Sequence, residues 1–143
     1  MRPLKFRAWD NERKEMTGSF GFNNVTGEDG HEGYIDTNPN NEGINNDISP
    51  GEIGDRYILM QYTGIQDVNG VEIYESDVVL ASLKADLFLV NGLPNTIKMT
   101  VEWDMRGQWS MKGKNFSMGN MWCIADYDMT VIGNIYQNPE LLK

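Results

Sequence analysis

The sequence predicts a mainly β protein whose C-terminal part forms a small barrel or a strongly bent sheet. Short apolar runs alternate with polar residues in steps of two, which is the period of a strand with one buried face. Gly, Asn, Asp and Pro separate these runs at short intervals, as they do between the strands of small β domains. Little of the chain carries a helical period. We therefore expect five strands between residues 77 and 136.

The first strands are predicted in the N-terminal part of the chain. In LKFRAWD, residues 4–10, Leu4, Phe6 and Ala8 alternate with their neighbours, which places one set on a core face. A polar turn, NERK, follows this run. The later run RYILMQY, residues 56–62, is β-branched and aromatic and suits a buried strand.

A hairpin is predicted at Asn69-Gly70. This dipeptide readily takes positive φ at both central positions of a type I′ turn. We therefore expect the strands near Ile65 and Ile73 to pair with each other. The chain then turns at residues 75–77 into the first strand of the barrel.

The C-terminal strands follow at short intervals. The stretch with DVVLA and DLFLVN, residues 77–91, permits a helix or two strands, and we favour strands. The run IKMTVEW places Met99, Val101 and Trp103 on one face, and GQWSMK is able to pair back onto it.

The last predicted strand is MTVIGNIY, residues 129–136. Its interior Gly133 predicts a bulge or a close backbone approach. Asn138 and Pro139 then suit the start of one short helical turn, because Asn caps helices and Pro is favoured at their first position.

The negative charge of the chain is concentrated in one segment. The net charge is −9, and residues 17–55 carry no Lys or Arg against eight Asp or Glu. This segment is rich in Gly and Asn, and we expect a long, mostly irregular acidic loop with one short strand near Tyr34 and Ile35. Such a charge weighs against binding to a nucleic-acid backbone, which requires Lys and Arg.

Length and composition favour a single soluble domain. The chain of 143 residues is long enough for one core. No apolar run approaches the roughly 18 residues that span a bilayer, and the N-terminus lacks the apolar region of a signal peptide. A lone Cys123 agrees with a reducing compartment. We therefore expect a cytoplasmic protein that does not bind membranes.

Five blocks of the sequence carry a family resemblance. The blocks are KFRAWD at 5–10, LMQYTG at 59–64, NGVEIYESDVV at 69–79, VEW at 101–103 and VIGNIYQNPELL at 131–142. In this order they resemble the signature blocks of the YopX family, small proteins of phages and prophages. The family usually has Gly in the place of Ser76. The turn at Ser76 therefore either does not need positive φ or tolerates the strain.

The resemblance implies a β-rich fold with an SH3-like barrel in the C-terminal part. We accordingly expect an N-terminal β segment at 1–64 that contains the acidic loop 17–55, and the barrel with its short helical turn at 65–143. The two parts are expected to form one compact unit. The resemblance carries over no activity, because none is established for the family, and it places the protein in the cytoplasm of a host bacterium.

Several acidic and polar residues near the predicted hairpin resemble oxygen ligands of calcium. They are Asp67, Asn69, Glu72, Glu75 and Asp77. The spacing fails the helix-loop-helix calcium pattern, because Gly70 follows Asp67 by three residues and no acid stands at the twelfth position. Turn formation explains these residues without a metal.

No set of residues identifies a metal, a cofactor or a catalytic site. His31 and Cys123 are the only residues of their kinds and together cannot supply the four ligands of structural zinc. A nucleophilic Cys needs an adjacent base, and a small buried side chain suits the surroundings of Cys123 equally well. We predict no cofactor and assign no catalytic residue.

Aromatic residues raise the question of a binding platform, since small barrels use them to bind peptides or single strands. The aromatic residues in question are Trp103, Trp109, Trp122, Tyr127 and Tyr136. Filling of the core is the first explanation for them. One locally basic aromatic patch stands out as a candidate site for a partner, and it consists of Trp109, Lys112, Lys114 and Phe116.

Three functional hypotheses follow. The first is a non-enzymatic phage accessory protein that binds a protein partner or assembles into a homo-oligomer. The second is an acidic mimic of nucleic acid that blocks a DNA-binding protein of the host. The third is a carboxylate-dependent hydrolase, with a site at Glu102 and Asp104 or at Asp126 and Asp128. The first is favoured, because no nucleophile or oriented base accompanies the carboxylate pairs.

Overall fold

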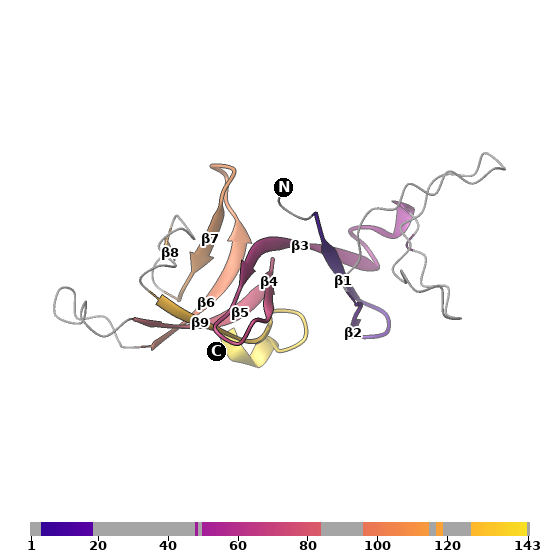
Figure 1. Cartoon of the computed structure of the whole chain (residues 1–143). Helices are drawn as coiled ribbons and strands as arrows, with labels where there is room; N and C mark the ends of the chain where they lie inside the picture. Colours follow the sequence, from indigo (N-terminus) through magenta and orange to yellow (C-terminus); the bar gives the residue numbers. More distant parts are fainter. Residues whose placement is uncertain are drawn as a thin grey trace. The chain divides into compact units, whose positions relative to one another are not determined.

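The computed structural model describes residues 4–18, 48, 50–83, 96–114, 117–118 and 127–142. The chain divides into two compact units, Met1–Tyr62 and Thr63–Lys143. Strands are the main regular elements among the described residues of both units, as Figure 1 shows, and this confirms the predicted mainly β class. Within the described ranges, no helix has both the length and the apolar character that crossing a membrane requires.

The first unit is a small antiparallel sheet with its own core. It contains β1 (Phe6–Asp10), β2 (Glu15–Met16), the 3-10 turn η1 (Pro50–Glu52) and the first part of β3 (Tyr57–Gln66). β1 lies between β2 and β3 and is antiparallel to both. The core of the unit consists of Ala8, Ile48 and Tyr57, with Phe6 and Leu59 packed against them.

The predicted strand at 4–10 is confirmed from Phe6 onward, but its alternation is incomplete. Leu4 precedes β1 and is exposed, whereas Trp9 and Asp10 are both buried. Asp10 is buried because its carboxylate closes the turn after β1. Oδ1 accepts from the backbone N–H groups of Glu12 and Arg13, and Oδ2 accepts from Nη2 of Arg56 at 3.1 Å. A polar side chain at a strand end therefore takes a buried place.

The second unit is built around a five-stranded antiparallel sheet. Its strands are β5 (Asp77–Leu83), β6 (Thr96–Trp103), β7 (Trp109–Lys112), β8 (Ser117–Met118) and β9 (Tyr127–Asn134), in the order β8-β7-β6-β5-β9. The short β4 (Glu72–Tyr74) pairs with β3. Figure 1 shows the sheet curling on itself. Four of the five strands predicted after Asp77 are confirmed as β5, β6, β7 and β9, whereas β8 was not predicted.

The sequence ambiguity between helix and strand is resolved in favour of a strand over Asp77–Leu83. Val79 pairs with Met99 on one side and with Val131 on the other, so β5 is an inner strand of the sheet, between β6 and β9. The second half of that stretch, DLFLVN, lies outside the described residues, as does the strand predicted near Tyr34.

The core of the second unit lies on one face of this sheet. It consists of Ile73, Val79, Ala81, Met99, Val101, Trp109, Met111 and Met129. The period of two explains why β6 sends Met99 and Val101 inward. Trp103 was predicted on the same face, yet it is 51% exposed, because it is the last residue of β6. Its ring packs edge-on against Trp109, with centroids 4.9 Å apart.

The bulge predicted at Gly133 is confirmed, and the segment that approaches this glycine closely does so with side chains. Val78 pairs with Gly133 and Val79 with Val131, so Ile132 is an extra residue and β9 is bulged. A Cβ at Gly133 would lie 2.6 Å from both Oδ1 of Asn138 and Cδ1 of Leu141. The predicted helical turn is the 3-10 turn η3 (Pro139–Leu142), and it packs closely because residue 133 lacks a side chain.

The predicted type I′ turn at Asn69-Gly70 is wrong. Gly70 has a φ of 80°, but Asn69 does not have a positive φ. The N–H of Gly70 donates to the carbonyl of Asp67 at 3.0 Å, so Val68 and Asn69 form the turn and Gly70 follows it in the left-handed region. The Asp67 side chain, which accepts from the N–H of Asn69, selects this turn.

The turn at Ser76 needs a positive φ and tolerates the strain, which was the second of the two predicted alternatives. Its φ is 65°, in the region that glycine occupies at little cost. The surrounding strands hold it there, because its N–H donates to the carbonyl of Val101 and its carbonyl accepts from the N–H of Ile135. The idea that a serine shows the turn does not need positive φ is therefore wrong.

Candidate functional site

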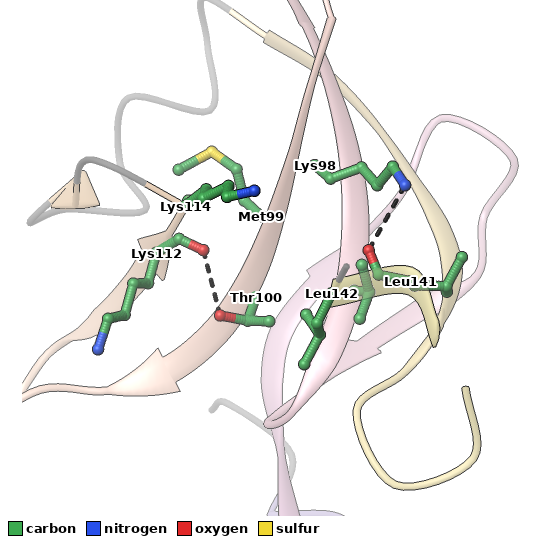
Figure 2. A pocket seen from close by; sticks show the side chains of 9 residues that line it. Lys98, Met99, Thr100, Lys112, Lys114, Leu141 and Leu142 are labelled. Atoms are coloured by element: carbon green, nitrogen blue, oxygen red, sulfur yellow. Dashed lines mark hydrogen bonds between the residues drawn. The ribbon is translucent and has the colours of Figure 1, made fainter. Parts of the chain in front are cut away.

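A groove on the second unit is the candidate site. It encloses a cavity of about 320 Å³. Strands β5 and β6, the segment after β7 and the turn η3 surround it, as Figure 2 shows. The described lining residues are Val78, Lys98, Met99, Thr100, Lys112, Gly113, Lys114, Leu141 and Leu142. We call this feature the lysine groove.

The register of the sheet explains why these residues meet. Val78 pairs with Thr100, and Thr100 pairs with Lys112, so one outward-facing row crosses three strands. The hydroxyl of Thr100 donates to the carbonyl of Lys112 at 3.1 Å and fixes the end of β7 beside β6. The close approach of η3 at Gly133 brings Leu141 and Leu142 to the other wall.

The lysine groove combines an apolar base with a cationic rim. Val78 is fully buried and Met99 is 1% exposed, so the base is rigid and aliphatic. Lys98, Lys112 and Lys114 are exposed at the rim. The described lining contains neither Asp nor Glu. Nζ of Lys98 donates to the carbonyl of Leu141 at 3.4 Å, which is a long hydrogen bond. The arrangement is suited to an anionic ligand that also has apolar groups.

The structure separates the members of the aromatic patch that the sequence singled out. Lys112 and Lys114 line the groove. Trp109 is only 7% exposed and belongs to the core, so Trp103 rather than Trp109 presents its ring to solvent. Phe116 lies outside the described residues, and so does Trp122.

Sequence reasoning missed the other half of the groove. In the sequence, Lys98 is 14 residues from Lys112, and Leu142 is 30 residues after Lys112. The alternation of Lys98 and Thr100 on the outer face of β6 was a usable signal. The pairing of β6 with β7 and the position of η3 were not, because both depend on the tertiary fold.

The acids that resemble calcium ligands have structural partners. Asp67 is 7% exposed, and its Oδ1 accepts from the N–H groups of Asn69 and Val71. Its Oδ2 accepts from the N–H of Val131, 64 residues away, at 3.0 Å. Burial opposes the charged form, but the hydrogen bonds from the backbone of Val131, Val71 and Asn69 prevail and lower the pKa of Asp67. The Asp67 carboxylate thus joins the β3–β4 hairpin to β9.

Asp77 is likewise part of the framework. It is 1% exposed, its Oδ2 accepts from the N–H of Tyr74 at 2.8 Å, and its Oδ1 accepts from Nδ2 of Asn134. Oε2 of Glu72 accepts from the hydroxyl of Tyr74. Among the residues that the structure describes, no group of three or more His, Cys, Asp or Glu is placed to hold a metal ion.

The two carboxylate pairs of the hydrolase hypothesis have different positions. Asp104 closes the β6–β7 hairpin, where its Oδ2 accepts from Nε of Arg106 at 3.1 Å. Glu102 is partly buried and pairs across the sheet with Ser110. Asp128 is exposed on β9, and Asp126, His31 and Cys123 lie outside the described residues.

A second cavity lies in the first unit. It has a volume of about 250 Å³, and Asp10, Arg13, Glu15, Met16, Thr17, Gly18 and Tyr57 line it. Asp10 already binds Arg56, and burial opposes its ionisation while the bonds from Arg13, Arg56 and Glu12 lower its pKa. This carboxylate therefore serves the turn between β1 and β2, and the lysine groove is the better candidate.

Comparison with known proteins gives a family and a structural relative. The model of the YopX protein family matches residues 5–143. The crystal structure of protein EF1440 from Enterococcus faecalis is similar over 100% of both chains, with a TM-score of 0.61 and 25% sequence identity. No protein with a curated description matches.

Proposed function

This chain belongs to the YopX family, and on that premise we propose that it acts without catalysing a reaction, by binding a protein partner or by assembling with itself. We propose further that it is a phage or prophage accessory protein that works in the cytoplasm of the host bacterium. The family resemblance of its five sequence blocks supports the phage context.

The lysine groove is the observation that carries this proposal. It is preformed, because backbone pairing of three strands and the fully buried Val78 fix its base. Clefts with an apolar base and a few polar groups at the rim are the usual binding sites of small domains. The two lysines of the predicted partner patch, Lys112 and Lys114, lie at this rim.

A barrel of the SH3-like type is part of the same proposal. Two backbone groups of the bulged β9 bind the β3–β4 hairpin: Val131 donates to Asp67, and the carbonyl of Met129 accepts from Val68 at 3.0 Å. These bonds cover a part of β9 that the sheet itself leaves unpaired. Covering of an exposed edge is how small β domains avoid unspecific pairing, so this part of β9 is not open to another strand.

Blocking the groove tests the proposal. Thr100→Tyr places a bulky side chain on the outer face of β6, and Met105→Tyr is the matched control at a fully exposed hairpin tip. Each protein is used for affinity capture from phage-infected cells and for sedimentation at several concentrations. We expect a captured protein or self-association with the unchanged chain and with Met105→Tyr, and its loss with Thr100→Tyr.

Two results would contradict the proposal. One is a chain that stays monomeric at every concentration and captures no protein. The other is a partner or self-association that Thr100→Tyr retains at full strength, because binding would then use another surface.

A further inference from the structure

We propose that the occupant of the lysine groove is an acidic segment of a partner protein, with aliphatic side chains on the apolar wall of the groove and carboxylates at the lysine rim. This inference rests on the proposed function and names the chemistry of the partner. It commits to a partner other than a second copy of this chain.

The charge of the groove is opposite to the charge of the protein. The chain carries −9, yet the described lining of the groove holds three lysines and no acid. Three like charges around one cavity repel each other unless anions offset them. A carboxylate-bearing ligand relieves this repulsion when it binds, which a neutral ligand does not.

The apolar wall of the groove determines the second part of the ligand chemistry. Leu141 and Leu142 are aliphatic, and Leu141 is partly buried whereas Leu142 is 51% exposed. Covering these side chains removes apolar surface from water, which favours binding by about 25 cal/mol per Å². Charge alone would therefore leave part of the available binding energy unused, and we expect Leu, Ile or Val between the acids.

The size of the groove favours a short segment. Its volume of about 320 Å³ is at the low end for cavities that bind small ligands. The row Val78, Thr100 and Lys112 crosses three strands, so the ligand has room along one direction of the sheet. A few consecutive residues of an extended peptide fit this shape.

The same features argue against a nucleic-acid strand. Single strands bind where aromatic side chains stack on successive bases, and the described lining of the groove contains no aromatic residue. The chain as a whole repels a long polyanion at −9. A short acidic peptide experiences mainly the local lysines, because salt screens charges beyond about 10 Å.

One lysine at the rim, Lys98, is able to exchange its present hydrogen bond for one to a ligand carboxylate. Nζ of Lys98 holds the carbonyl of Leu141 at 3.4 Å, near the limit for a hydrogen bond. A carboxylate offers a shorter, charge-assisted bond of about 2.8 Å. Lys98 therefore forms a stronger hydrogen bond when it turns toward the ligand. The side chain of Leu141 then contacts the apolar groups of the ligand.

Peptide titration followed by amide NMR of the full chain tests the inference. The probe is a blocked octapeptide of Glu and Asp with three aliphatic residues, and its controls are the same peptide with Gln and Asn, the same peptide with Lys, and oligothymidine. We expect the acidic peptide to shift the amides of Val78, Thr100 and Leu142, and to lose affinity as salt is raised.

Two double variants separate local charge from net charge. Lys112→Gln with Lys114→Gln removes two charges at the rim, and Arg13→Gln with Arg106→Gln removes two charges at exposed positions outside the groove lining. We expect affinity for the acidic peptide to fall about 10-fold in the first and to change less than about twofold in the second. Leu142→Ser should weaken the acidic peptide and the Gln/Asn peptide by the same factor.

The inference is overturned if the Gln/Asn peptide, the Lys peptide or oligothymidine binds the groove as tightly as the acidic peptide does, or if no peptide shifts the groove amides. It is also overturned if Lys112→Gln with Lys114→Gln abolishes self-association, since the occupant would then be a second copy. In each case the effect of Thr100→Tyr on capture still decides the proposed function, so the two failures are distinguishable.

Discussion

Two hairpin loops of the second unit have the same local structure and different tertiary roles. In each, an Asp is followed three residues later by a Gly in the left-handed region, Gly70 with a φ of 80° and Gly107 with a φ of 74°. In each, the Gly N–H donates to the Asp carbonyl at 3.0 Å. Oδ1 of Asp67 and Oδ1 of Asp104 both accept two backbone N–H groups of their own loop.

The second carboxylate oxygen makes the difference. Oδ2 of Asp104 accepts from Nε of Arg106 and Nε2 of Gln108, which belong to its own loop. Oδ2 of Asp67 accepts from the N–H of Val131 in β9. The same short motif thus forms an isolated hairpin tip in one place and a connection between distant strands in the other. Local sequence decides the turn, and the surrounding fold decides its role.

The largest expected difference is in the stability of the two Asp→Ala variants. Asp67→Ala leaves the N–H groups of Asn69, Val71 and Val131 without their acceptor, and we expect it to lower the free energy of unfolding by about 3 kcal/mol. Asp104→Ala should lower it clearly less, because its partners are accessible to water. Urea denaturation measures both. Equal losses would show that the bond to β9 does not contribute to stability.

Acid should distinguish the two loops next. The pKa of Asp67 is lowered in the folded state, because its backbone hydrogen bonds prevail over burial. A lowered folded pKa stabilises the protein above the ordinary Asp value of about 3.9 and stops doing so as pH falls through the folded pKa. We expect Asp67→Asn to lose less stability than the unchanged chain between about pH 5 and about pH 2.

Asp104→Asn is the matched control for this loss of stability at acid pH. The pKa of Asp104 is also lowered, although burial opposes it, mainly by the bonds from Gln108 and Arg106. These donors are exposed or partly exposed. The dependence of stability on acid pH should therefore change less in Asp104→Asn than in Asp67→Asn. Urea midpoints across the acid range provide the measurement. A steeper loss of stability at acid pH in Asp67→Asn would refute the assignment.

The two glycines should be equivalent, which tests the shared part of the comparison. Neither Gly70 nor Gly107 has an atom within 4 Å of the position of an added Cβ. Only backbone strain then acts, so Gly70→Ala and Gly107→Ala should each lower the free energy of unfolding by about 1 kcal/mol. Thermal or urea unfolding that separates the two by more than about 1 kcal/mol would mean that tertiary contacts also constrain one turn.

Ser76 provides the reverse test, because it is a residue other than glycine in the left-handed region. Because its φ is 65°, Ser76→Gly removes strain and should raise the free energy of unfolding by up to about 1 kcal/mol. Ser76→Ala keeps the strain and should leave the urea midpoint close to that of the unchanged chain. A loss of stability in Ser76→Gly would indicate that the greater freedom of glycine in the unfolded chain outweighs the strain.

The smallest effect is expected at the tip of the second hairpin. Arg106 pairs with Asp104 at 3.1 Å, but 66% of its side chain is exposed. Exposed ion pairs rarely contribute measurably, so Arg106→Ala should leave the urea midpoint unchanged at physiological salt. A clear loss would show that the second oxygen of Asp104 has structural weight after all, and the contrast with Asp67 would weaken.

These loops also show how far sequence reasoning reaches. The turn at Asp104 to Gly107 and the hairpin near Gly70 both follow from turn chemistry. The type of the turn at Asn69 could not be predicted in this way. The Asp67 carboxylate accepts from the N–H groups of Asn69 and Val71, and this favours a turn other than type I′. The exposure of Trp103 and the burial of Trp109 could not be read from alternation, since the two are directly paired at the same end of β6 and β7 and only tertiary packing covers one of them.

The sequence by itself determined most of the described strands, the bulge at Gly133, the helical turn at Pro139 and the family. Each of these depends on a local period, on a residue of special backbone geometry or on a block of adjacent letters. Only the tertiary structure decided that Asp67 joins β9, that Ser76 holds a left-handed turn, and that Lys98, Lys112 and Leu142 meet in one groove. These contacts join residues far apart in the chain, and their energies arise only when the whole sheet has formed.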